Sequence, residues 1–173
     1  DVVDPSVPTI LTSYISPNHT DDTWTYVAFG EWPQTIKDKD VIVDETKSRQ
    51  MGMFTYYLGS DGNYYVKVTA NPYANTYKYS NESEVKKDEE VYFKVEPIVW
   101  RVLTEDYKVP GEDGELQRTG QALLLAENIL TGGIPYYVDS SWRTIAGDTV
   151  YPNNYKYSTI RAWLNGKYED DDT

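Results

Sequence analysis

Short apolar runs separated by turn-forming residues recur along most of the chain, and this pattern predicts β-strands. The first run is residues 24–29 (WTYVAF), which Gly30 and Pro33 are expected to end. The clearest signal is a hairpin over residues 53–68, in which FTYYL and YYVKV flank the turn formers of residues 59–63. We therefore expect neighbouring strands to pair antiparallel.

A second group of strand signals follows a polar interval. Residues 91–96 (VYFKVE) and 98–103 (IVWRVL) predict two strands that Pro97 separates. After a Gly- and Pro-rich turn at 108–120, residues 122–126 (ALLLA) predict another strand. We expect IVWRVL and ALLLA to form an antiparallel pair.

One helix is predicted, over residues 159–165. Ser158 can cap its amino end, and Gly166 suits the position after its last turn. The apolar side chains recur at helical spacing and form one stripe, which consists of Ile160, Trp163 and Leu164. We expect this stripe to pack on the IVWRVL and ALLLA strands. Arg161 lies in the first turn, where the helix dipole disfavours a cation, so a carboxylate or carbonyl groups should hold it.

The pattern as a whole predicts a mainly antiparallel α+β domain with one or two short helices and long loops. Residues 1–23 are rich in turn formers and form an extended lead-in, and residues 24–173 form a single domain. Within it, residues 35–90 carry long insertions. Their apolar residues 41–43 are either a short strand or part of a loop, and residues 71–90 form a long excursion.

Composition excludes several partners. The 173 residues include 28 acidic and 16 basic side chains, for a net charge of -12, so nucleic acid is not expected to bind. No apolar run approaches the roughly 20 residues that span a bilayer, so membrane insertion is not expected. The chain has no Cys and therefore no disulfide or thiolate metal site.

Catalytic signals are few. His19 is the one histidine and lies among turn formers, and the sequence has no nucleophile elbow, phosphate-binding loop, dinucleotide fingerprint or HExxH helix. Glycoside hydrolysis needs two carboxylates, and three acids beside hydrophobic segments qualify: Glu31, Glu96 and Glu127. Structural roles are the favoured interpretation, since Glu127 can bind a backbone amide or Arg161. We expect both Glu127 and Arg161 to be buried, and no catalytic residue is assigned.

Oxygen-rich loops raise the alternative of calcium. Residues 60–63, 112–115 and 169–172 could supply ligands, but none follows the EF-hand pattern. Turn geometry explains the Asp-Gly pairs without a metal. We therefore expect no metal and no cofactor, with calcium as the alternative.

The strongest hint of binding is the aromatic content, with 17 Tyr and 5 Trp. These side chains offer large rigid faces with a polar edge, which suit sugar rings and protein surfaces. Those near Pro, Gly, Ser and Asn are the candidate ligand contacts: Trp32, Tyr136, Tyr137, Trp142, Tyr155 and Tyr157. Others are expected in the core, together with aliphatic residues: Phe29, Trp100, Leu124, Ile160, Trp163 and Leu164. Structural filling of a Leu-poor sheet is the alternative for any one of the aromatic residues.

Four segments in order carry a resemblance: FGEWPQ at 29–34, IVWRVL at 98–103, ALLLAENIL at 122–130 and YSTIRAWLNG at 157–166. They are similar to a bacterial family of unknown function with an FG-x-aromatic-PQ opening, a W-x-VL strand, an LLL-S/A-E strand and an S-x-I/L-R-x-WLN helix. The resemblance implies a secreted or cell-surface protein and a C-type-lectin-like arrangement. Family members continue past the helix, so it also implies that a C-terminal half of the domain lies beyond Thr173.

These observations together predict a non-catalytic extracellular binding or adhesion module of a bacterial surface protein, which recognises a glycan or a partner protein. A carbohydrate-active hydrolase with paired carboxylates is one alternative. A structural spacer domain is another.

Overall fold

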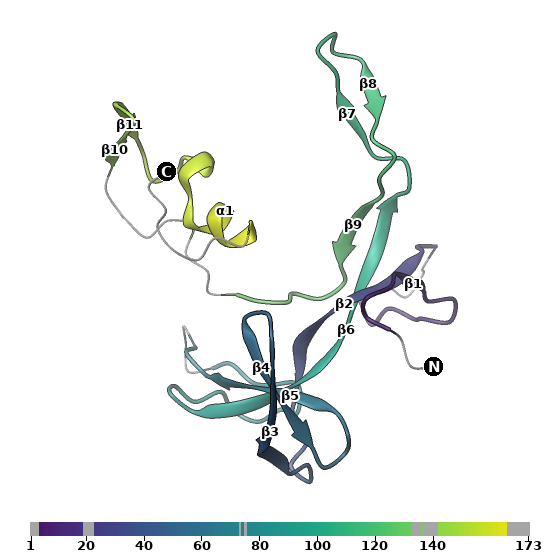
Figure 1. Ribbon diagram of the computed structural model, residues 1–173, viewed down its shortest axis with the longest axis vertical. Helices are drawn as coiled ribbons and strands as arrows, with labels where there is room; N and C mark the ends of the chain where they lie inside the picture. The colour runs from purple at the N-terminus through teal and green to yellow at the C-terminus, as the bar shows by residue number, and fades with distance from the viewer. Residues whose placement is uncertain are drawn as a thin grey trace. The chain divides into compact units, whose positions relative to one another are not determined.

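The computed structural model describes residues 4–18, 23–72, 74, 76–132, 136 and 142–165. The chain divides into two compact units, residues 1–130 and 131–173 (Figure 1). The sequence analysis did not anticipate a boundary at residue 130.

The first unit contains nine named strands: β1 (Thr9–Ile10), β2 (Tyr26–Ile36), β3 (Val43–Met51), β4 (Phe54–Gly59), β5 (Tyr64–Thr69), β6 (Glu90–Thr104), β7 (Lys108–Pro110), β8 (Leu116–Arg118) and β9 (Leu123–Ala126).

The main sheet has the strand order β1-β2-β6-β5-β4-β3, and β9 also pairs with β6. Every strand pair in it is antiparallel. The expected mainly antiparallel sheet with little helix is therefore confirmed. The β6–β9 pair, with Trp100 opposite Ala126 and Val102 opposite Leu124, confirms the predicted pairing of IVWRVL with ALLLA.

The β4–β5 hairpin lies where the turn formers place it. Asp61 organises the turn, because its carboxylate accepts hydrogen bonds from Asn63 N at 3.2 Å and from the Tyr65 hydroxyl at 2.8 Å. Gly59 is required here, since a β-carbon at this position would lie 2.5 Å from the Tyr65 ring. Tyr65 is only 2 % exposed, so the turn closes directly over a core residue.

Strand β2 continues through Gly30 and Pro33, which the sequence analysis expected to end it. Two β-bulges against β6 accommodate these residues: register shifts fall between Ala28 and Glu31 and between Pro33 and Thr35. Gly30 takes a φ of 72°, a conformation that glycine adopts without strain. The prediction was wrong because a bulge absorbs both residues within a continuing strand.

Strand β6 likewise runs through Pro97, so the two predicted strands are one element of 15 residues. Pro97 lies opposite Glu31, at the edge of the first bulge of β2. A proline has no N–H to donate, and a bulge is a position where a ladder hydrogen bond is already interrupted. The missing donor therefore does not end the strand.

Three loop predictions are refined by the structure. The polar interval after residue 35 contains a full strand, β3, and the turn at 108–120 contains the β7–β8 hairpin, which projects from the main sheet (Figure 1). The excursion at 71–90 holds an isolated bridge between Lys78 and Glu84 and otherwise lacks strands among its described residues until β6 begins at Glu90.

The second unit contains β10 (Arg143–Ile145), β11 (Asp148–Val150), the 3-10 turn η1 (Tyr155–Tyr157) and helix α1 (Thr159–Leu164). The helix confirms the prediction for this segment. Ser158 caps it, with its side chain accepting from Arg161 N at 3.2 Å. Gly166 lies outside the described residues. The packing of α1 on the two strands of the first unit stays a prediction.

The buried apolar residues are mostly in the strands: Tyr26, Ala28, Tyr56, Tyr65, Val66, Ala70, Ile98 and Val150. Two expected core residues are corrected. Phe29 is 41 % exposed, because it falls within the first bulge of β2, where the alternation of faces is interrupted. Leu164, the last residue of α1, is 60 % exposed. The other four expected core residues are half-buried: Trp100, Leu124, Ile160 and Trp163.

Candidate functional site

The most buried polar cluster of the described residues is centred on Glu127, directly after β9. The Glu127 backbone N–H donates to Val99 O at 2.9 Å, which extends the β6–β9 ladder by one residue. Its side chain is 0 % exposed and accepts a hydrogen bond from the Ser16 hydroxyl. Asn18 donates to the Glu127 carbonyl at 3.2 Å. These contacts fasten residues 16–18 of the lead-in to the end of β9.

The charge of Glu127 is balanced by Arg101 of β6, whose Nε lies 3.4 Å from the second carboxylate oxygen. Neither of these two atoms has a hydrogen-bond partner among the described residues, so charge joins them. The Arg101 guanidinium also lies over the Trp24 ring, 5.5 Å from its centroid. Because hydroxyl, amide and guanidinium groups surround the carboxylate, a structural role explains Glu127.

Arg161 is exposed, which corrects the expectation that it is buried. Its guanidinium Nη1 donates to Lys156 O at 3.1 Å, so it reaches back from α1 to η1. The expected carbonyl partner is present, but on the surface of the second unit. Sequence spacing gave no signal for Arg101 as the partner of Glu127, because the pair forms only once β6 and β9 are in register.

The other two candidate carboxylates have separate partners. Glu96 lies opposite Trp32 in the β2–β6 ladder. Glu96 accepts from the Thr35 hydroxyl at 2.6 Å. Glu31 acts instead on Tyr56: burial, together with the charge and hydrogen bonding of Glu31, raises the pKa of Tyr56 to about 12.

The FGEWPQ segment has structural contacts. The Trp32 indole donates to Leu130 O at 2.6 Å, and its ring meets Phe54 edge-on with a centroid separation of 5.0 Å. The Trp100 indole donates to Phe29 O at 2.7 Å. Gln34 is the extra residue of the second bulge, and its amide donates to two carbonyls of β6, at 3.0 and 3.1 Å. Trp32, a predicted ligand contact, is thus half-buried with its polar edge occupied.

The other predicted ligand contacts lie in residues 131–173. Trp142, Tyr155 and Tyr136 are 60 %, 53 % and 46 % exposed. Tyr157 is half-buried, with the Lys156 ammonium 5.1 Å from its ring centroid. Tyr137 lies outside the described residues. The structure adds Tyr151, which is 61 % exposed and which its neighbour Pro152 could have indicated.

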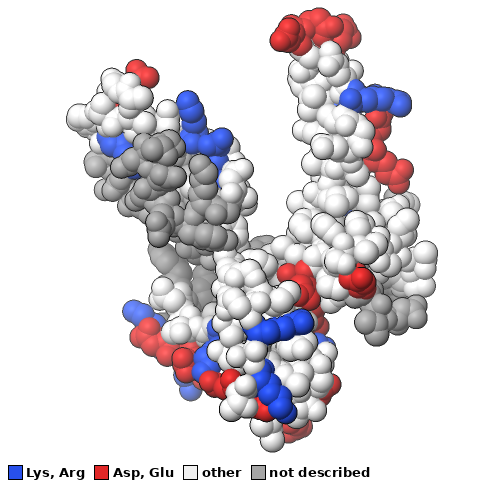
Figure 2. Space-filling view, in the orientation of Figure 1, with Lys and Arg blue, Asp and Glu red and all other residues white. Residues whose placement is uncertain are grey.

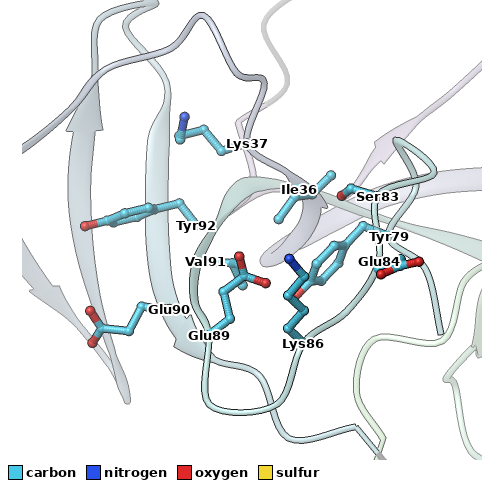
Figure 3. A pocket seen from close by; sticks show the side chains of 10 residues that line it. All are labelled: Ile36, Lys37, Tyr79, Ser83, Glu84, Lys86, Glu89, Glu90, Val91 and Tyr92. Atoms are coloured by element: carbon cyan, nitrogen blue, oxygen red, sulfur yellow. The ribbon is translucent and has the colours of Figure 1, made fainter. Parts of the chain in front are cut away.

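A pocket of about 390 Å³ in the first unit was not predicted. It lies where residues 79–89 of the excursion at 71–90 pass over the last residue of β2 and the first residues of β6 (Figure 3). Its lining combines an apolar floor with charged groups and consists of Ile36, Lys37, Tyr79, Ser83, Glu84, Lys86, Glu89, Glu90, Val91 and Tyr92. The only sequence signal was the interleaving of Tyr with Lys and Glu in this segment.

No cluster of three or more His, Asp or Glu side chains suited to a metal ion occurs among the described residues. At the first proposed calcium loop, 60–63, Asp61 is engaged by Asn63 and Tyr65. The loop at 169–172 and His19 lie outside the described part. The 112–115 loop forms the tip of the β7–β8 hairpin, where acidic side chains gather (Figure 2).

Within the described ranges, the helices are too short and too polar to cross a bilayer.

Comparison of the chain with protein families, with curated proteins and with solved structures finds no match. The resemblance described above therefore rests on its motifs alone.

Proposed function

We propose that the chain is a non-catalytic binding module that recognises a glycan or a partner protein through aromatic side chains of residues 131–173. The observation that carries this proposal is the exposure of Trp142, Tyr155, Tyr136 and Tyr151, each at least 46 % accessible within a segment of short elements. Exposed aromatic side chains of this density are costly to hydrate and are typical of binding surfaces.

A glycan is the favoured ligand. The apolar face of a sugar ring stacks on a flat Tyr or Trp side chain, and the phenol and indole groups can bond to its hydroxyls. A bacterial extracellular or cell-surface location and a C-type-lectin-like arrangement belong to this proposal, and the motif resemblance supports them. A partner protein that offers its own rigid side chains is the second occupant of the same surface.

The alternatives have less support. A hydrolase with paired carboxylates would need two of the three candidate acids in one cleft, whereas each has its own partner: Tyr56 for Glu31, Thr35 for Glu96, and Ser16 with Arg101 for Glu127. A spacer domain would not need exposed Trp142.

A glycan array and a pull-down with the whole chain test the proposal. Trp142→Ala should lower binding by about tenfold or more, since aromatic anchors contribute on the order of 2 kcal/mol. Tyr77→Ala is the matched control, because Tyr77 is 50 % exposed but lies in the first unit. No binding in either assay, or equal losses for the two variants, would contradict the proposal.

A further inference from the structure

The pocket beneath the excursion at 79–89 carries an inference that is independent of the aromatic surface. Its floor is made by Ile36 and Val91, and the Tyr79 ring packs edge-on against Phe93 at a centroid separation of 5.8 Å. A volume of about 390 Å³ falls in the range of small-molecule sites, which begins at about 300 Å³. The floor therefore suits an aliphatic group.

The Tyr79 hydroxyl is buried and has no hydrogen-bond partner among the described residues. Buried hydroxyls nearly always find a partner, because an unsatisfied one costs on the order of 1 to 3 kcal/mol. Burial and the nearby charge of Glu89 raise the pKa of Tyr79, so the phenol is neutral and can both donate and accept. A ligand group in the pocket would supply the missing partner.

Charges of both signs line the pocket without neutralising one another. Figure 3 shows Lys86 and Glu89 extending toward the Tyr79 ring from the same loop. In the described part of the chain, Lys86, Glu84 and Glu89 form no ion pair within 4.0 Å. Lys37 is different, because its ammonium donates to the carbonyls of Asp38 and Val41.

A ligand with charges of both signs matches this exposed charged rim better than a ligand with a single charge. An anion would gain Lys86 but face the carboxylates, and a cation would gain the carboxylates but face Lys86. A zwitterion can direct its ammonium to Glu89 and its carboxylate to Lys86 at once, each as a charge-assisted hydrogen bond. We propose that this pocket binds a small aliphatic α-amino acid, with its ammonium at Glu89, its carboxylate at Lys86 and its side chain on Ile36 and Val91.

The test is a titration of the whole ¹⁵N-labelled chain, followed by amide chemical shifts, with three probes: L-leucine, N-acetyl-L-leucine and L-leucine methyl ester. L-leucine should shift amides of residues 79–92 with saturation below about 10 mM, a weak affinity typical of a small open site. Each derivative lacks one of the two charges and should bind about tenfold more weakly or worse, the cost of one charge-assisted hydrogen bond.

Variants locate the site. Tyr79→Phe keeps the ring that packs on Phe93 and removes only the hydroxyl, so it should weaken L-leucine binding about fivefold. Glu89→Gln and Lys86→Gln should each weaken it about tenfold or more. The matched control is Lys78→Gln with Glu82→Gln, an ion pair of the same excursion that does not line the pocket, and it should leave binding unchanged.

Three outcomes would overturn the inference. The first is no shift at residues 79–92 with L-leucine. The second is that either derivative binds as tightly as L-leucine, and the third is that Tyr79→Phe and Glu89→Gln both bind L-leucine as tightly as the wild-type chain. The dispersion of each variant's own spectrum reports whether it is folded. A glycan that shifts the same amides while L-leucine does not would assign the pocket to a different ligand and would also count against the inference.

Discussion

The two units differ in how they hold several of their aromatic side chains. In residues 1–130, the indoles of Trp32 and Trp100 donate to main-chain carbonyls, and Trp24 lies beneath Arg101. In residues 131–173, Trp142 and Tyr155 are more than half exposed. Aromatic content alone therefore does not indicate binding; exposure must be considered residue by residue, since Tyr136 is 46 % exposed although its hydroxyl donates to Asn153 O at 3.3 Å.

The difference follows from element size. Strand β6 has 15 residues and pairs with three other strands, so it gives aromatic side chains neighbours on both faces. The second unit has strands of three residues and a helix of six, which can cover few large side chains. Four predictions test how far this contrast holds.

Glu127→Gln should have the largest effect on stability. It removes the charge opposite Arg101 inside a site where the carboxylate is fully buried, and a broken buried pair leaves the other charge uncompensated. We expect a loss of about 3 kcal/mol in the free energy of unfolding, measured by urea denaturation.

Glu112→Gln is the control for this change, because Glu112 lies at the exposed tip of the β7–β8 hairpin. It should change stability by no more than about 0.5 kcal/mol. Equal losses of stability for Glu127→Gln and Glu112→Gln would contradict a stabilising role for the Glu127 cluster.

Gly30→Ala tests the bulge that lets β2 continue past its glycine. A β-carbon would meet Ile98 at 3.5 Å, an ordinary contact, so the cost comes from the φ of 72° and should be about 1 to 2 kcal/mol. Gly132→Ala is the matched control, since it has open space and no positive φ, and it should be near neutral. Thermal unfolding of both variants measures the difference.

Trp32→Phe and Trp142→Phe compare the two units directly. In Trp32→Phe, loss of the indole N–H leaves Leu130 O without its donor, so the free energy of unfolding should fall by about 1 kcal/mol. Trp142→Phe changes an exposed side chain and should lower the free energy of unfolding by less than about 0.5 kcal/mol. Chemical denaturation that ranks them the other way would reverse the contrast.

Stability is also expected to fall at alkaline pH. Burial and Glu31 raise the pKa of Tyr56 to about 12, above the value of about 10 for an unfolded tyrosine. The unfolded chain therefore loses this proton first, so the stabilisation is full below pH 10 and is lost as pH rises toward 12. Tyr65 acts in the same direction, because burial and Asp61 raise its pKa. Urea midpoints should fall over this interval, and Tyr56→Phe should make the fall shallower; an unchanged slope would contradict the assignment.

Local signals predicted the parts of the fold that depend on neighbouring residues. The β4–β5 turn, the Ser158 cap and the IVWRVL–ALLLA pair all formed as expected. The course of β2 and β6 through Gly30 and Pro97 was not predicted, because a bulge depends on the register of two strands that are distant in sequence.

The candidate site was predicted in part for the same reason. Exposed aromatic residues beside turn formers were found from local composition, whereas the Arg101 partner of Glu127 requires long-range register. The pocket beside Tyr79 requires the packing of an excursion on two strand ends, for which the sequence carries no periodic signal.

The most direct test of the contrast between the units is hydrogen exchange at the tryptophan indoles, read from ¹⁵N-labelled protein. The indole N–H groups of Trp32 and Trp100 should exchange slowly, because each is bonded to a carbonyl, and that of Trp142 should exchange at close to the solvent-exposed rate. Slow exchange at Trp142, or fast exchange at both Trp32 and Trp100, would contradict the account.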